Sequence, residues 1–170
     1  SCRIPFLVSW PAELPGGERR DELVSLTDLF GIATTAAGDP DLRDGHNVLG
    51  LFDGEAEPRE RLFGYHRTPG LAPNFTAMVR EDDWKYVFMR NGGREQLFDL
   101  AADPNELDEC SGRNPETTAE LRARLAEKLT EVGATEFVEN GTLRRAAAQQ
   151  IDMGRLVREP YPDAPEDLLE

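Results

Sequence analysis

The chain has 170 residues, of which 39% are hydrophobic, enough for one domain with a core or for the end of one domain plus a small second one. No apolar run approaches the roughly 18 residues of a membrane-spanning helix, so we expect no membrane partner. The net charge of −14 argues against nucleic acid and anionic membranes as partners, because both require a basic surface.

The first predicted element is a strand at residues 4–8, where the sequence Ile-Pro-Phe-Leu-Val is almost continuously apolar. Such a run is typical of a strand covered on both faces, as in the parallel sheet of an α/β domain. The rest of the chain offers no set of βαβ units to pair with it. We therefore expect its partner strands to precede Ser1.

A helix is predicted after Asp28, which is suited to cap its first turn. Apolar residues then recur at the spacing of one helical face, and these are Leu29, Ile32, Ala33 and Ala36. Gly38 is expected to end the helix. A polar stretch rich in Asp and Gly follows at residues 39–60.

Alternating side chains and short turns predict antiparallel hairpins in the middle of the chain. The acidic turn at residues 81–83 and the tight-turn pair Asn91-Gly92 separate successive apolar runs. Together with an earlier apolar segment they give a sheet of about four strands. The predicted strands are residues 62–65, 77–80, 84–90 and 95–100.

The clearest helix runs from Pro115 to Val132, with Asn114 as cap and Gly133 at its end. Its apolar stripe consists of Leu121, Leu125, Leu129 and Val132. Laid across the sheet, this helix would give a two-layer α+β unit. The aromatic side chains on one strand face, Trp84, Tyr86 and Phe88, would then form the core, with a sugar-stacking platform as the alternative.

Motifs for catalysis are absent from the sequence: it has no nucleophile elbow, no phosphate-binding glycine loop and no His or Cys cluster with metal-ligand spacing. We therefore predict no catalytic residue and no metal ligand in this chain. Cys2 and Cys110 are too few for a disulfide scaffold. Arg80 and Lys85 could lie at the rim of a site for an anionic substrate, and salt bridges to the many carboxylates explain them equally well.

Several segments, in this order, resemble the C-terminal portion of the sulfatase family within the alkaline-phosphatase superfamily. The first is SCRIPFLVSWP, which is similar to the family's Glu-Ser-x-Arg-Val-Pro strand leading to Trp-Pro. The segment LVSLTDL and the following helix are similar to the family's Val-Ser-Leu-x-Asp-Leu element. The remaining matches are the DGHNVL to DGE stretch, the MVR and WKYV strands, and QLFDL followed by DPNEL.

The resemblance implies a domain arrangement. Residues 1–60 would be the end of an alkaline-phosphatase-like α/β catalytic domain, residues 61–133 a small α+β domain of sheet plus helix, and residues 134–170 an extended tail with little regular structure beyond Arg158. The family's formylglycine nucleophile and its Ca²⁺ ligands would lie upstream of this chain, in a missing N-terminal catalytic portion. We therefore expect the chain alone to be inactive.

The implied function is that of the C-terminal part of a sulfatase acting on a sulfated small molecule or sulfated glycan. His66, Arg67 and Arg80 are the predicted residues at the substrate rim, since basic groups must offset the repulsion between an anionic substrate and an acidic chain. Two alternatives stay open. One is a phosphonate or phosphate ester hydrolase of the same superfamily, and the other is a non-catalytic binding module.

Overall fold

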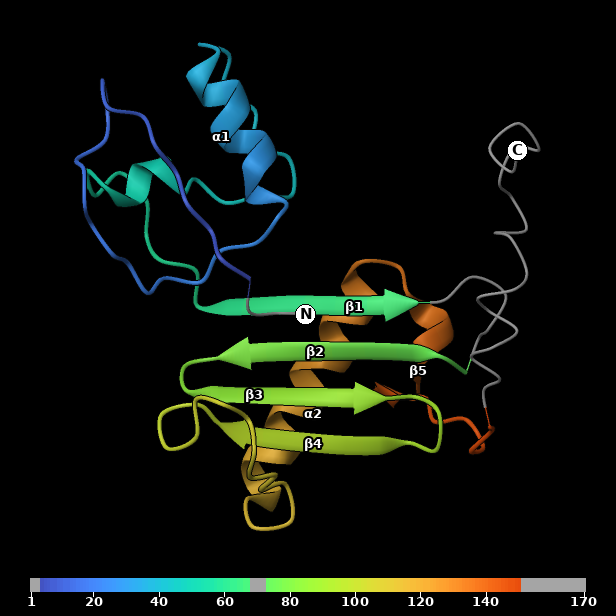
Figure 1. The fold of residues 1–170 in the computed structure, drawn as a ribbon. Coiled ribbons are helices and arrows are strands. Elements are labelled where there is room, and N and C mark those ends of the chain that lie inside the picture. The colour runs from blue at the N-terminus through green and yellow to red at the C-terminus, as the bar shows by residue number, and fades with distance from the viewer. Residues whose placement is uncertain (1–3, 68–72, 151–170) are drawn as a thin grey trace, which may run out of the picture.

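A computed structural model of the chain describes residues 4–67 and 73–150. Its main feature is one antiparallel sheet in the order β1-β2-β3-β4, with α2 crossing one face (Figure 1). The prediction of about four antiparallel strands packed on one helix is confirmed. The elements are α1 (Asp28–Ala36), the 3₁₀ turn η1 (Leu49–Leu51), β1 (Arg61–Arg67), β2 (Phe75–Glu81), β3 (Trp84–Met89), β4 (Arg94–Asp99), α2 (Pro115–Glu131), the 3₁₀ turn η2 (Thr135–Phe137), β5 (Val138–Glu139) and β6 (Thr142–Leu143).

The turns of the sheet follow from residues that tolerate a left-handed backbone. Asp82, between β2 and β3, has a φ of 48°, and Gly92 and Gly93, between β3 and β4, have φ values of 77° and 64°. Glycine adopts such angles without steric cost, and Asp does so more readily than most residues. These turns set the register in which Val79 pairs with Tyr86, and Tyr86 in turn pairs with Leu97.

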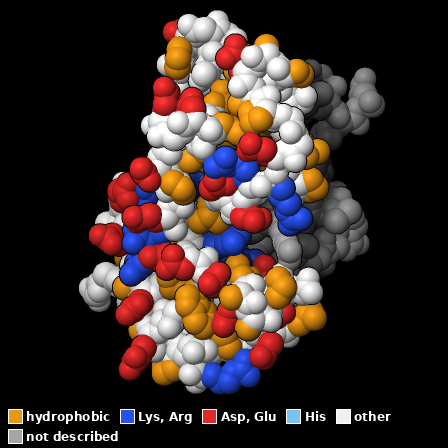
Figure 2. All heavy atoms as spheres, turned by 90° about the vertical axis from the view of Figure 1, so that its left-hand side faces the viewer, with side chains coloured by type: hydrophobic (Ala, Val, Ile, Leu, Met, Phe, Trp, Pro, Cys, Tyr) orange, Lys and Arg blue, Asp and Glu red, His pale blue; other side chains and the backbone are white. Residues whose placement is uncertain are grey.

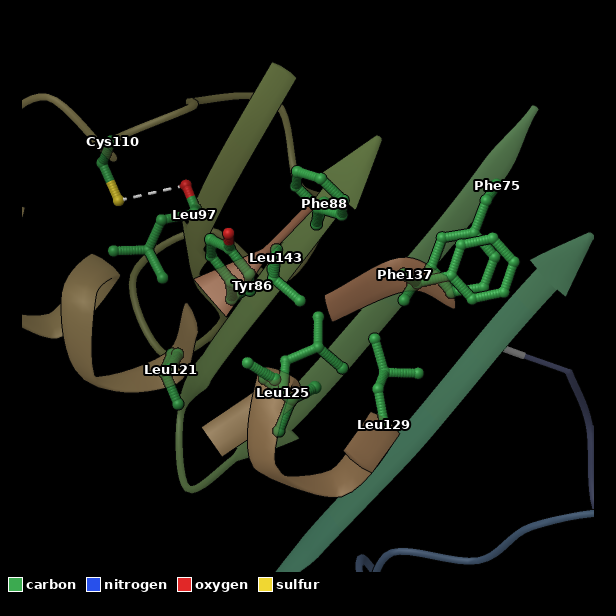
Figure 3. Close-up of a cluster of buried hydrophobic side chains, with 13 residues drawn as sticks. Phe75, Tyr86, Phe88, Leu97, Cys110, Leu121, Leu125, Leu129, Phe137 and Leu143 are labelled. Carbon is green, nitrogen blue, oxygen red and sulfur yellow. Dashed lines mark hydrogen bonds between the residues drawn. The ribbon is translucent and has the colours of Figure 1, made fainter. Parts of the chain in front are cut away.

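The core lies between α2 and the sheet (Figure 3). Tyr86, Phe88 and Leu125 are almost completely buried there, and Trp84 packs against the same cluster. The prediction that the aromatic face lies under the leucine stripe is confirmed. Each fully buried side chain of this size stabilises the fold by about 1.5–3 kcal/mol. The buried cluster comprises Phe75, Ala77, Val79, Tyr86, Phe88, Leu97, Cys110, Leu121, Leu125, Ala126, Leu129, Phe137 and Leu143.

Val132 is the one member of the predicted stripe that does not belong to the core. It is 52% exposed, because α2 ends at Glu131 and Val132 is already the C-cap. Gly133 follows with a φ of 76°, as expected for the residue that stops a helix. Cys110 is a free, buried thiol whose Sγ donates to the carbonyl of Leu97 at 3.3 Å, whereas Cys2 lies outside the described residues.

The N-terminal part differs most from its prediction. Residues 4–8 do not form a strand, and Leu7 is 94% exposed. A strand needs neighbours to bond its backbone groups, and no described segment supplies them there. The helix α1 does form, but its predicted apolar face was wrong: Leu29 is 48% exposed, and the buried residues are Asp28 and Gly31.

Residues after α2 include more regular structure than an extended tail. The turn η2 and the β5–β6 hairpin bring Phe137 and Leu143 into the core, and the Phe137 ring stacks on Phe75 with 3.7 Å between centroids. Asn140 and Gly141 make the two-residue turn with φ values of 51° and 75°. Residues 151–170 lie outside the described part of the chain, and no helix within the described residues is long and apolar enough to span a membrane.

Candidate functional site: a groove on the open face of the sheet

The sheet has one face that α2 does not cover, which we call the open face. Because side chains alternate along a strand, Met78 and Arg80 on β2 lie on this face, whereas Ala77 and Val79 point into the core. The register places Arg80 between Leu62 on β1 and Lys85 on β3. Two basic side chains, Arg80 and Lys85, therefore lie next to each other in the middle of the open face, with the apolar Leu62 beside Arg80.

Two adjoining hollows of about 530 and 360 Å³ run along the open face, and we call them together the sheet groove. Leu62, Met78 and Lys85 line both hollows. The larger hollow is walled by residues 24–26 and extends to His66. The walls of the smaller one are Arg19, Asp21, Arg80, Leu100, Pro104 and Glu106. Both volumes fall within about 300–1,000 Å³, the usual range for small-ligand sites.

The charged groups of the smaller hollow differ in their partners. The Nζ of Lys85 lies 2.5 Å from a carboxylate oxygen of Glu106, and the exposed Arg19 lies 4.0 Å from Asp21. Arg80 is half-buried and forms no ion pair with any other residue that the structure describes. Its Nε is buried and has no hydrogen-bond partner within residues 4–67 and 73–150. Among these residues, one cation of the groove is therefore not neutralised.

The three predicted rim residues occupy two different faces. His66 and Arg80 both line the sheet groove, at different hollows. Arg67 is paired in register with Phe75 of the core face, and its guanidinium lies 3.2 Å from Glu136 and 5.8 Å from the ring centre of Phe137. The structure thus brings two of the three candidates onto one face. Their role in substrate binding stays a prediction.

A buried ion pair fixes one wall of the groove. The carboxylate of Asp28 is fully buried, accepts bonds from the two terminal nitrogens of Arg59 at 2.6 and 3.0 Å, and accepts another from the backbone N–H of Ser25 at 2.6 Å. Arg59 also donates to the carbonyl of Leu23 at 3.0 Å. Burial acts to raise the pKa of Asp28, but these hydrogen bonds, with one from the N–H of His46, outweigh burial and lower it. Sequence reasoning identified Asp28 only as a helix cap and missed Arg59.

A half-buried carboxylate, Glu95, ties the sheet to α2. It accepts a hydrogen bond from the Tyr86 hydroxyl at 2.6 Å and two from Arg122, one of them at 2.9 Å. Burial of the carboxyl acts to raise the pKa of Glu95, but the bonds from Arg122 and Tyr86 outweigh burial and lower it. Burial also raises the pKa of Tyr86. This network lies on the core face and not in the groove.

The residues present do not fit a metal site. Across residues 4–67 and 73–150, no group of three or more His, Cys, Asp and Glu side chains is placed to hold an ion. On the side of the molecule drawn in Figure 2, Lys and Arg side chains are interspersed with Asp and Glu and form no single large basic patch. On this side the basic groups therefore lie singly or in small groups among acidic ones.

Comparison with known proteins identifies the family. Residues 1–135 match the family described as N-sulphoglucosamine sulphohydrolase, C-terminal. The chain belongs to this sulfatase family. The resemblance inferred from the sequence motifs is therefore confirmed, as the C-terminal portion of a sulfatase.

Comparison with individual sulfatases shows which share of their length this chain covers. The chain is 31% identical to arylsulfatase K of Mus musculus over 138 residues, which cover 74% of this chain and 24% of that protein. It is 32% identical to the choline-sulfatase of Rhizobium meliloti over 130 residues, covering 72% of this chain and 24% of that protein. The chain thus spans about a quarter of the length of these relatives.

Solved structures share the fold. The structure of Ps i-CgsB in complex with k-i-k-neocarrahexaose superposes with a TM-score of 0.54 at 19% identity, covering 88% of this chain and 31% of that one. The structure of BT4656 in complex with its substrate D-glucosamine-2-N,6-O-disulfate gives a TM-score of 0.52 at 17% identity, covering 64% and 24%. At these identities the likeness establishes a shared fold over the matched part and nothing about the ligand of this chain.

Proposed function

We propose that this chain is the C-terminal part of an enzyme that hydrolyses sulfate esters. The observation that carries the proposal is the match of residues 1–135 to the sulfatase C-terminal family. The groove agrees with it, because a chain with a net charge of −14 holds there a half-buried cation suited to an anionic substrate.

In this proposal the chain contributes binding and not the chemical step. A formylglycine nucleophile and a calcium ion, which would stabilise charge on the sulfate oxygens, belong to a part of the enzyme outside these residues. The described residues lack a set of ligands for that ion. Basic groups at the rim, with His66, Arg67 and Arg80 as candidates, would orient the substrate and offset its repulsion from the acidic chain.

The proposed substrate is a sulfated small molecule or a sulfated glycan. Support comes from the relatives, since one is a choline-sulfatase and BT4656 was solved with a sulfated glucosamine as its substrate. The hollow volumes of about 530 and 360 Å³ would admit one sugar ring or a molecule of similar size at each position.

The test compares two proteins and two esters. The longer protein that contains this chain should release sulfate from para-nitrophenyl sulfate in the presence of calcium, measured by ion chromatography. The 170-residue chain should release none above a buffer control. Turnover by the chain alone would overturn the proposed division of roles. A longer protein that cleaves only a phosphonate or phosphate ester would overturn the assignment of a sulfatase, and one that binds sulfated sugars without cleaving any ester would indicate a binding module.

A further inference from the structure

We infer that Arg80 is the binding group of a sulfate subsite in the smaller hollow of the sheet groove, with Lys85 beside it. The inference rests on the proposed function and goes beyond it, because it selects one residue and assigns it one chemical group of the substrate. The group is a sulfate ester that helps to position the substrate.

The basic side chains of the smaller hollow differ in whether they have an acidic partner. The other basic side chains of this hollow are matched with acids, Lys85 with Glu106 and Arg19 with Asp21. Arg80 has no such acid among the described residues, although the chain has 33 Asp and Glu against 19 Lys and Arg.

The position of Arg80 in the sheet is unfavourable for a cation. Arg80 and Lys85 are direct cross-strand neighbours, and like charges directly opposite each other destabilise a pair of strands. The buried Nε of Arg80 adds a further cost, because it has given up water without gaining an acceptor. Glu106 already offsets the charge of Lys85, so the cost that remains is that of the Arg80 guanidinium, and an anion bound there would remove it.

The side chain of Arg80 is chemically suited to a sulfate ester. A guanidinium presents paired N–H donors in a planar fork, which matches two oxygens of one oxyanion. A sulfate ester carries a single negative charge and three terminal oxygens, so one such group would neutralise the one cation left over. Apolar side chains of Leu62, Leu100 and Pro104 line the same hollow of about 360 Å³ and could contact the carbon part of the substrate.

Binding to the isolated chain gives the first test. Ethyl sulfate is titrated into the ¹⁵N-labelled chain, and saturable shifts are expected at the backbone amides of Leu62, Arg80 and Lys85, with a Kd in the millimolar range. Arg80→Gln should weaken binding at least tenfold. Arg113→Gln removes the same charge at an exposed loop position and should change binding less than twofold. Acetate, tested in parallel as a carboxylate anion, should bind more weakly than ethyl sulfate.

Folding of the variants is checked by circular dichroism. If Arg80→Gln does not fold, Arg80→Lys replaces it: this variant keeps the charge but loses the fork, and binding should still weaken by several-fold. Absence of saturable shifts in the wild-type chain would overturn the inference. An equal loss in the Arg113 variant, or acetate binding as tightly as ethyl sulfate, would also overturn it.

Kinetics of the longer protein separate this inference from the proposed function. With a sulfated substrate, Arg80→Gln should raise KM at nearly constant kcat, as for a contact equal in ground and transition states. If the protein releases sulfate but the variant has unchanged kinetics and a lower Tm, Arg80 pairs with a carboxylate elsewhere in the protein and the inference alone fails. If the protein hydrolyses no sulfate ester while the chain still binds ethyl sulfate through Arg80, the proposed function alone fails.

Discussion

The buried pair Asp28 and Arg59 offers the sharpest test of what holds the N-terminal part together. The Asp28 carboxylate is 0% exposed and the Arg59 side chain 16% exposed, so neither can exchange its partner for bulk water. Between them they bond the backbone at Leu23, Ser25 and His46. Asp28→Asn keeps the shape of the side chain and removes its charge.

The expected loss follows from this geometry. Removing one partner of a buried ion pair costs about 3–5 kcal/mol, because the other charge remains buried without compensation. Asparagine keeps one acceptor oxygen for the backbone N–H groups, so we expect the lower end, about 3 kcal/mol. With a urea m value of about 2 kcal/mol/M, the midpoint of unfolding should fall by about 1.5 M.

Urea unfolding followed by tryptophan fluorescence measures this shift. Asp21→Asn is the matched control: Asp21 is 93% exposed and 4.0 Å from its arginine, so its loss should be below about 0.5 kcal/mol. The double variant Asp28→Asn with Arg59→Met should be less destabilised than the sum of the single variants, since it leaves no charge unpaired. Equal midpoints for Asp28→Asn and Asp21→Asn would refute the reasoning.

Two further predictions concern the core face of the sheet. Phe88→Ala should lower the free energy of unfolding by about 3–5 kcal/mol. Leu107→Ala, at a side chain that is 85% exposed, is the control and should change it by less than about 0.5 kcal/mol. A loss below about 1 kcal/mol for Phe88→Ala would contradict the packing described for this side chain. The pKa of Glu95 is lowered below 4.5, so its stabilisation is complete above that value and is lost as pH falls through the folded-state pKa. The Tm should therefore stay constant from neutral pH to about pH 5 and decrease when the pH is lowered below about 4. Glu95→Gln should make this decrease less steep. An equally steep decrease in the variant would count against the network with Arg122.

Local signals explain which elements could be predicted from the sequence. The strands β2 to β4 and the helix α2 were predictable because turn residues, alternation and a proline at the first helical position all agree. The β5–β6 hairpin was missed although it carries a signal of the same kind. Asn140-Gly141 lies between Val138 and Leu143 and forms the two-residue turn of this hairpin.

Features that could not be predicted from the sequence depend on contacts between residues far apart in the chain. Nothing in the sequence pairs Asp28 with Arg59, which lies 31 residues away, and the burial of Asp28 reverses the face that periodicity assigned to α1. At the groove, Arg80 could be selected by charge and strand position alone. That Arg80 has no acidic partner among the described residues could not be predicted from the sequence, because it depends on Glu106 pairing with Lys85 rather than with Arg80.

The two parts of the chain differ in how they bury apolar side chains, and this bears on whether it could be an independent binding module. In the sheet part, Val79, Tyr86 and Leu97 are completely buried. In the N-terminal part, α1 buries Asp28, while Leu7 is 94% exposed and other large side chains are 38–61% exposed. Exposed apolar side chains at this end agree with the proposed sulfatase, in which they would pack against the catalytic portion.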